Sequence, residues 1–127
     1  MSENHTILIV DDEQDVLTYL QTLFEDHGFK TVTATNGIEA MEVVAATQPD
    51  LITLDITMPE QSGVKTYRNL KDNAAFAHIP VVVITALGET QYNFMGTRRQ
   101  VPKPEGFMAK PIDHQELIKI VSDLLEQ

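Results

Sequence analysis

The amino-acid sequence predicts an α/β protein built on an open, parallel sheet of five strands. Short apolar runs rich in β-branched residues alternate along the chain with longer stretches that have the periodicity of amphipathic helices. Three of the short runs are followed directly by Asp or Lys residues, the arrangement expected where strands end at a common functional edge. The 127 residues suit one core, and no repeat, low-complexity tract or linker divides them.

The first part of the chain predicts two strands, each followed by a helix. Thr6–Val10 is almost continuously apolar, which is typical of a strand buried on both faces. Residues 15–27 predict a helix that ends at Gly28. Residues 30–35 form the second strand, and Asn36-Gly37 breaks it before the second helix. The expected apolar stripes are Val16, Leu17, Leu20, Leu23 and Phe24 in the first helix and Ile38, Met41, Val44 and Ala45 in the second.

A third strand, residues 51–54, ends on Asp55. The loop after it contains Pro59 and closes on Gly63, and residues 64–72 predict a helix. The apolar positions of this helix recur every three residues, at Val64, Tyr67 and Leu70.

The fourth strand is the most strongly β-like segment, residues 81–84, and it ends on Thr85. Residues 106–109 form the last strand, and a helix over residues 114–125 follows with Asp113 as its N-cap. The apolar stripe of that helix is Leu117, Ile118, Val121, Leu124 and Leu125.

The segment between the last two strands, residues 86–105, departs from regular patterning. Its glycines and prolines leave only residues 89–99 as a helix, and the apolar stripe there is thin. We expect a short or irregular helix and then a mobile loop around Pro102 and Pro104.

Composition excludes several classes of protein. The formal net charge of −10 disfavours direct binding to nucleic acid, and it is explained by solubility alone. There is no Cys for disulfides or thiolate metal sites, no apolar run long enough for a membrane span, and no signal-peptide pattern at the start. We therefore expect a cytoplasmic protein.

Charged side chains at three strand ends are the candidate site. Asp11 and Asp12 follow the first strand, Asp55 the third and Lys110 the last. Parallel strands bring such ends to one edge of a sheet, where ligands bind. Because crowded carboxylates repel one another, a hard divalent cation with oxygen ligands suits this group. The sequence thus predicts a metal-dependent acidic pocket with one lysine.

Four motifs occur in order at the expected strand ends. They are Ile7-Leu8-Ile9-Val10-Asp11-Asp12-Glu13, Asp55-Ile56-Thr57-Met58-Pro59 with Gly63, Ile84-Thr85-Ala86, and Phe107-Met108-Ala109-Lys110-Pro111. In these four motifs the chain resembles the response regulator receiver domains of two-component phosphorelay signalling. The resemblance implies a flavodoxin-like fold, a five-stranded parallel sheet of order 2-1-3-4-5 with helices on both faces.

The resemblance also assigns the acidic residues. It makes Asp55 the phosphoacceptor, a carboxylate nucleophile that forms an acyl phosphate. It implies Mg²⁺, or Mn²⁺ in its place, bound by Asp12 directly, by Asp11 through water, by Asp55 and by the backbone carbonyl of Thr57. Asp11, Asp12 and Glu13 also suit the start of a helix, where acidic side chains are stabilised by the helix dipole.

Three further residues are implied to act on the phosphoryl group. Lys110 resembles the lysine that pairs with the acidic site and then with the phosphoryl group, with a cis peptide bond before Pro111. We prefer Lys110 to Lys103, because a proline before Lys103 is unsuited to a strand. Thr85 would donate its hydroxyl to a phosphoryl oxygen, and Phe107 occupies the aromatic switch position.

The implied partners are a sensor histidine kinase or phosphotransfer protein, which donates the phosphoryl group from a phosphohistidine, and an unknown downstream protein. The chain would be a phosphoacceptor that catalyses its own phosphotransfer and dephosphorylation rather than an enzyme. It would be a monomer or a phosphorylation-dependent dimer, and it would bind no membrane. Residues 1–127 make one receiver domain with a core over about residues 6–125. No effector domain is visible, which fits either a stand-alone receiver or a piece of a longer protein.

Two other classes of function stay open. The first is an interaction module on a receiver scaffold that works without phosphate, which a locked conformation of residues 86–105 would favour. The second is a phosphatase with an aspartyl nucleophile, but the haloacid-dehalogenase type needs a second aspartate where this chain has Thr57. A flavin-binding flavodoxin is disfavoured because Asp11 and Asp12 would repel the flavin phosphate.

Overall fold

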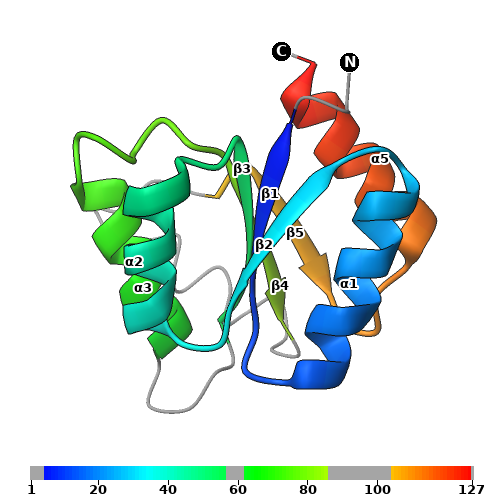
Figure 1. Cartoon of the computed structure of the whole chain (residues 1–127), viewed down its shortest axis with the longest axis horizontal. Coiled ribbons are helices and arrows are strands. Elements are labelled where there is room, and N and C mark those ends of the chain that lie inside the picture. The colour runs from blue at the N-terminus through cyan, green and yellow to red at the C-terminus, as the bar shows by residue number, and fades with distance from the viewer. Residues whose placement is uncertain (1–4, 57–61, 86–103, 127) are drawn as a thin grey trace.

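The computed structural model describes residues 5–56, 62–85 and 104–126. They form a five-stranded parallel sheet of order β2-β1-β3-β4-β5, with α2 and α3 on one face and α1 and α5 on the other (Figure 1). The elements are β1 Thr6–Val10, α1 Gln14–Asp26, β2 Lys30–Ala34, α2 Gly37–Thr47, β3 Leu51–Asp55, α3 Ser62–Asp72, β4 Val81–Thr85, β5 Gly106–Ala109 and α5 His114–Leu125. This confirms the predicted fold, and each predicted strand and helix in the described ranges lies within a few residues of its predicted bounds.

Strand pairing brings the carboxyl ends of the strands to one edge of the sheet. Val10 pairs with Leu54, Asp55 with Ile84, and Thr85 with Ala109. In Figure 1 this edge is the lower one, where β1 ends and the chain turns into α1. Every residue of β3 and β4 is buried, because helices cover both faces of the sheet there.

The core consists of two apolar clusters, one on each face of the sheet. The cluster under α2 and α3 contains buried side chains that alternate along β1, β3 and β4 with those of the cluster under α1 and α5. The helices contribute Ala40, Val44, Tyr67 and Leu70 to the first cluster and Leu17, Leu20, Phe24, Leu117 and Val121 to the second. The predicted stripes of α1, α3 and α5 are therefore confirmed, although some of their members are only partly buried.

The predicted stripe of α2 is partly wrong. Val44 is buried and Met41 half-buried as expected, but Ile38 is 79% exposed and Ala45 is also exposed. The true buried side contains Ala40 and Val44, which lie four residues apart and so on one face of the helix. Ile38 and Ala45 point away from it, because 100° per residue puts them on the opposite side.

Side chains cap two helices as their sequences suggest. Asp113 accepts hydrogen bonds from the backbone N–H groups of Gln115 and Glu116 at 3.0 and 3.1 Å, which confirms it as the N-cap of α5. Asn36 accepts one from the N–H of Glu39 at 2.8 Å at the start of α2. These bonds satisfy helix N–H groups that have no partner within the helix.

A buried lysine fixes the chain where it enters β5. Lys71, in the last turn of α3, lies 3.0 Å from both carboxylate oxygens of Glu105 and donates to the carbonyls of Ala77 and Ile79. Glu105 also accepts a hydrogen bond from the N–H of Val81 at 2.8 Å. One ion pair thus joins α3, the start of β4 and the residue before β5, and no sequence pattern predicts it.

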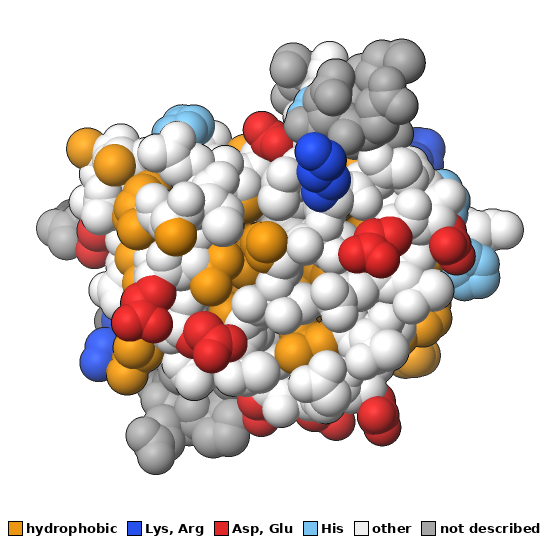
Figure 2. All heavy atoms as spheres, in the orientation of Figure 1, with side chains coloured by type: hydrophobic (Ala, Val, Ile, Leu, Met, Phe, Trp, Pro, Cys, Tyr) orange, Lys and Arg blue, Asp and Glu red, His pale blue; other side chains and the backbone are white. Residues whose placement is uncertain are grey.

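Several predictions concern residues outside the described ranges. The irregular helix over residues 89–99, the loop around Pro102 and the metal-binding carbonyl of Thr57 are among them. Within the described ranges, no helix is long and apolar enough to cross a membrane. Acidic side chains are spread over the face drawn in Figure 2, including its lower edge, where β1 ends in Figure 1.

Candidate phosphoacceptor site

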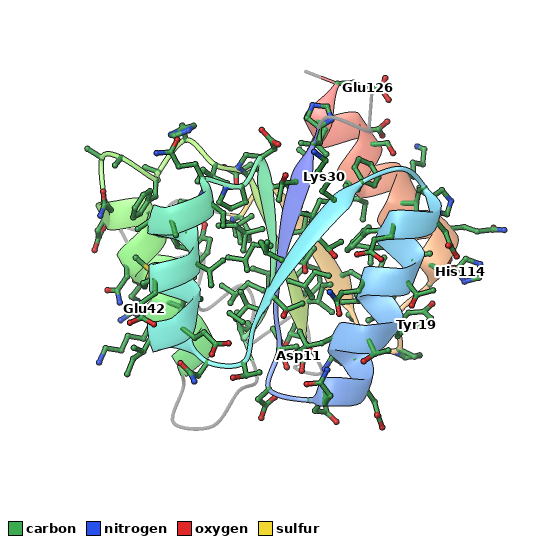
Figure 3. All side chains as sticks on the ribbon, in the orientation of Figure 1. Asp11, Tyr19, Lys30, Glu42, His114 and Glu126 are labelled. Carbon is green, nitrogen blue, oxygen red and sulfur yellow. The ribbon has the colours of Figure 1, made fainter. Side chains whose placement is uncertain are left out.

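The carboxyl ends of four strands place the predicted side chains together. Asp11 directly follows β1, Asp55 is the last residue of β3, Thr85 is the last residue of β4, and Lys110 directly follows β5. The N–H of Lys110 donates to the carbonyl of Thr85 at 2.8 Å, which fixes the backbone of the lysine against β4. In Figure 3 Asp11 lies at the lower end of β1, on the edge of the sheet where the strands end.

Three carboxylates form the acidic half of the site. Asp11, Asp12 and Asp55 each offer one oxygen, and these oxygens all lie within 4.8 Å of one another. The side chains of Asp11 and Asp55 are each only 3% exposed, whereas Asp12 is exposed. An oxygen-only group of this kind, open to solvent on one side, suits a hard divalent cation such as Mg²⁺, which keeps several water ligands.

Lys110 is the basic half of the site. Its ammonium nitrogen lies 3.4 Å from Asp55 Oδ2, to which it donates a hydrogen bond, and 3.5 Å from Asp11 Oδ2. Burial lowers the pKa of Lys110, but Asp55 and Asp11 raise it more, so that the net pKa is above its ordinary value. The lysine is therefore charged throughout the physiological pH range. Lys110 and Pro111 are joined by the expected cis peptide bond.

The ionised form of Asp11 is unfavourable in this site. Burial raises its pKa to about 6, and the charges of Asp55 and Asp12 act in the same direction. The N–H of Glu13, which donates to Asp11 Oδ1 at 2.9 Å, and the charge of Lys110 oppose this shift only in part. A bound cation would relieve the strain, because it favours the ionised carboxylate.

Thr85 and Phe107 lie on adjacent strands. Thr85 is fully buried, and Phe107 packs against the cluster under α2 and α3. Phe107 pairs with Val83 and Thr85 with Ala109, so Thr85 and Phe107 face the same side of the sheet, offset by two residues along the strands. The structure thus brings the side chains of Asp11, Asp12, Asp55 and Lys110 together at one edge of the sheet. Thr85 and Phe107 lie on the adjacent strands β4 and β5. Thr57 lies outside the described residues.

Glu13 is a further member of the site. From the sequence it was expected only as part of the first motif and of an acidic helix start. Its Oε1 atom lies 3.6 Å from the ammonium nitrogen of Lys110. The signal available in the sequence was its position directly after Asp11 and Asp12, but adjacency alone does not say which way a side chain points.

The chain matches the family model of the response regulator receiver domain over residues 7–122. A five-stranded parallel sheet of order 2-1-3-4-5 is also the fold of the solved receiver structures that this chain resembles. The chain belongs to the response regulator receiver domain family, the receivers of two-component signalling.

Similar proteins support this membership. The chain is 33% identical over 119 residues to Protein Rrf1 of Nitratidesulfovibrio vulgaris, which covers 94% of this chain and 81% of that protein. It is 30% identical to the polar-differentiation response regulator DivK of Brucella anthropi, over 94% of this chain and 95% of that protein. It is 36% identical to the response regulator Rre1 of Synechocystis sp., of which it spans only 53%.

Solved structures show the same fold. The signal receiver domain of a signal transduction histidine kinase from Syntrophus aciditrophicus has a TM-score of 0.85 and 31% identity, over 96% of this chain and 90% of that one. The chemotaxis protein CheY4 of Vibrio cholerae has a TM-score of 0.83 at 21% identity, over 94% of this chain and 98% of that one, and shares the fold.

Proposed function

We propose that this receiver accepts a phosphoryl group on Asp55 from a phosphohistidine of a sensor histidine kinase or phosphotransfer protein. It would act in the cytoplasm as a phosphoacceptor rather than as an enzyme with a separate substrate. One observation carries the proposal: three carboxylates with oxygens within 4.8 Å of one another face a lysine ammonium 3.4 Å from Asp55. That arrangement supplies a nucleophile together with positive charge for a phosphoryl group.

Asp11, Asp12 and Asp55 are the side chains that would hold Mg²⁺ or Mn²⁺, with the carbonyl of Thr57 as a proposed fourth protein ligand. When bound, the ion neutralises negative charge on the carboxylates and on the phosphoryl oxygens. The protein's contribution is the convergence of the oxygens, two of them on buried side chains whose strands fix their positions.

The proposed transfer is an in-line displacement at phosphorus. A carboxylate oxygen of Asp55 attacks, and the phosphorus–nitrogen bond of the phosphohistidine breaks. Its electron pair stays on that nitrogen, and because the other ring nitrogen carries a proton, the leaving group is neutral histidine. Lys110 pairs with an equatorial phosphoryl oxygen as a point charge, and the hydroxyl of Thr85 donates to another. Because the pKa of Lys110 is raised, the ammonium stays charged while the donor approaches.

The proposed response to phosphorylation uses Thr85 and Phe107. The phosphoryl charge would draw the threonine hydroxyl toward Asp55, and the aromatic ring would fill the space that the threonine leaves. Both residues face one side of the sheet on adjacent strands, so a movement of one changes the packing of the other. The downstream protein would read this change in packing.

The proposal predicts Mg²⁺-dependent phosphorylation by acetyl phosphate that requires Asp55. Wild type, Asp55→Asn and Asp50→Asn are each incubated with acetyl phosphate, with Mg²⁺ or with a chelator, and separated on a phosphate-affinity gel. Asp50 is the matched control, because it is exposed at the start of β3, at the opposite edge of the sheet. We expect a shifted band for wild type and Asp50→Asn in Mg²⁺ only. Equal shifts for wild type and Asp55→Asn would exclude Asp55 as the acceptor.

A further inference from the structure

Glu13 gives Lys110 a third carboxylate neighbour, and this one is at the solvent-exposed rim of the site. The ammonium nitrogen lies 3.6 Å from Glu13 Oε1, against 3.5 Å from Asp11 and 3.4 Å from Asp55. The side chain of Glu13 is 65% exposed, whereas those of the two aspartates are almost fully buried. Lys110 thus has two partners fixed in the protein interior and one that can leave it freely.

The backbone of Glu13 is fixed although its side chain is exposed. Glu13 is the N-cap of α1, with φ −100° and ψ 118°, and its N–H donates to Asp11 Oδ1 at 2.9 Å. An N-cap side chain usually accepts a hydrogen bond from the first turn of its helix, but that of Glu13 makes no such bond. Its carboxylate lies beside Lys110 instead.

We propose that Glu13 competes with the phosphoryl group for Lys110 and thereby limits how readily small anionic donors phosphorylate this receiver. A phosphoryl oxygen reaches the ammonium only if a carboxylate gives up its place, and the exposed Glu13 is the one that can move. Its negative charge also opposes the approach of an anion to the site. This inference rests on the function proposed above for Asp55.

The size of the effect follows from the exposure of the pair. An exposed ion pair is weak, because solvent and salt screen it and its side chains lose freedom when they pair. We therefore expect Glu13→Gln to increase the rate of phosphorylation by acetyl phosphate about two- to fivefold, and to lower the concentration of beryllofluoride needed for half-saturation by a similar factor. The buried aspartates still hold Lys110 in the variant, so the site itself stays intact.

Asp15→Asn is the matched control. Asp15 lies two residues further along, in the first turn of the same helix, and the substitution removes the same charge. Asp15 and Lys110 both line a hollow of about 320 Å³ beside the site, but no ion pair joins them in the described part of the chain. Both variants therefore lose one acidic charge near the helix N-terminus, and only Glu13→Gln removes a partner of Lys110.

The test measures phosphorylation rates and beryllofluoride binding for wild type, Glu13→Gln and Asp15→Asn, in Mg²⁺ at low salt and at about 1 M salt, where the screening length falls to about 3 Å. We expect Glu13→Gln to exceed both other proteins at low salt, and the difference to shrink at high salt. A purely structural role of Glu13 would not produce this salt dependence.

Three results would overturn the inference. If Glu13→Gln were phosphorylated more slowly than wild type, or at the same rate, Glu13 would not compete for Lys110. The proposed function would still stand in that case, provided that wild type is phosphorylated. An equal gain in Asp15→Asn would assign the effect to general surface charge. If wild type were not phosphorylated by acetyl phosphate and did not bind beryllofluoride, the proposed function would fail, and this inference would fail with it.

Discussion

Asp11 destabilises the metal-free protein when its carboxyl group is ionised. Its carboxylate is buried beside Asp55, and its pKa is raised to about 6 from 3.8. The folded protein therefore binds a proton at this position more tightly than the unfolded chain does, and its stability falls as the pH rises through the interval between these values. At neutral pH without metal, the ionised Asp11 costs on the order of 3 kcal/mol, since one pKa unit corresponds to about 1.4 kcal/mol.

Asp11→Asn should accordingly stabilise the metal-free protein at neutral pH. The amide removes the buried charge and keeps an oxygen that can accept from the N–H of Glu13. We expect the free energy of unfolding in urea with a chelator to rise by about 1–3 kcal/mol at pH 7, and the gain to shrink toward about pH 4. Added Mg²⁺ should stabilise wild type but not the variant.

The comparison with Mg²⁺ separates two explanations. If Asp11→Asn gave no gain at pH 7 in chelator, Asp11 would not be a strained carboxylate. If Mg²⁺ stabilised the variant as much as wild type, Asp11 would not be needed to hold the ion.

Thr53 is a buried polar residue without a hydrogen-bond partner. Its hydroxyl lies in the middle of β3, between Ile9 and Val82 on the neighbouring strands, and makes no hydrogen bond. Burying an unsatisfied hydroxyl is unfavourable, and valine has nearly the same shape. We expect Thr53→Val to raise the free energy of unfolding by about 1 kcal/mol, measured in urea. Thr31→Val should give no such gain, because Thr31 donates to Glu25 at 2.7 Å; a destabilised Thr53→Val would contradict this account.

At the scale of elements, the start of α3 is packed directly on the end of β3. A Cβ atom added to Gly63 would collide with the carbonyl oxygen of Asp55 and with the Cα atom of Ile56. Both contacts are with backbone, which cannot rotate away as a side chain can. The absence of a side chain at this position therefore allows α3 to support the strand end that carries Asp55.

Gly63→Ala should consequently displace Asp55 as well as destabilise the fold. We expect a loss of about 1–3 kcal/mol in the free energy of unfolding, or more, together with slower phosphorylation by acetyl phosphate. Gly106→Ala is the control. The atoms nearest to its Cβ would be side-chain methyl groups of Ile120 and Val82, at 3.0–3.4 Å, so it should leave phosphorylation close to that of wild type. If both variants lost phosphorylation equally, the contact between α3 and β3 would have no special role.

The sequence predicted helices and strands well where hydrophobic periodicity determines them. It predicted less well the features that depend on contacts between elements. The inner strands β3 and β4 are continuous apolar runs in the sequence because helices cover both faces of the sheet there. In α2, many positions around the helix are apolar, so the pattern did not define one face, and Ile38 was wrongly placed inside. The ion pair of Lys71 and Glu105 could not be predicted, because it joins residues 34 positions apart through side-chain geometry alone.

For the whole molecule, the order of the strands is what creates the site. β3 lies between β1 and β4, so Asp55 ends beside Asp11 on one side and beside the strand of Thr85 on the other. The convergence of Asp11, Asp12, Asp55 and Lys110 was predicted from the sequence, because parallel strands share the edge at which they end. The part played by Glu13 was not, since it depends on the direction of one exposed side chain.

The most direct test of the account is to locate the phosphoryl group on the chain. After incubation with acetyl phosphate and Mg²⁺, borohydride reduction converts an aspartyl phosphate to homoserine, which peptide mass spectrometry assigns to a position. The account predicts homoserine at position 55, and none there when Mg²⁺ is removed by a chelator. Homoserine at Asp11 or Asp12, or its formation at position 55 without any divalent ion, would contradict it.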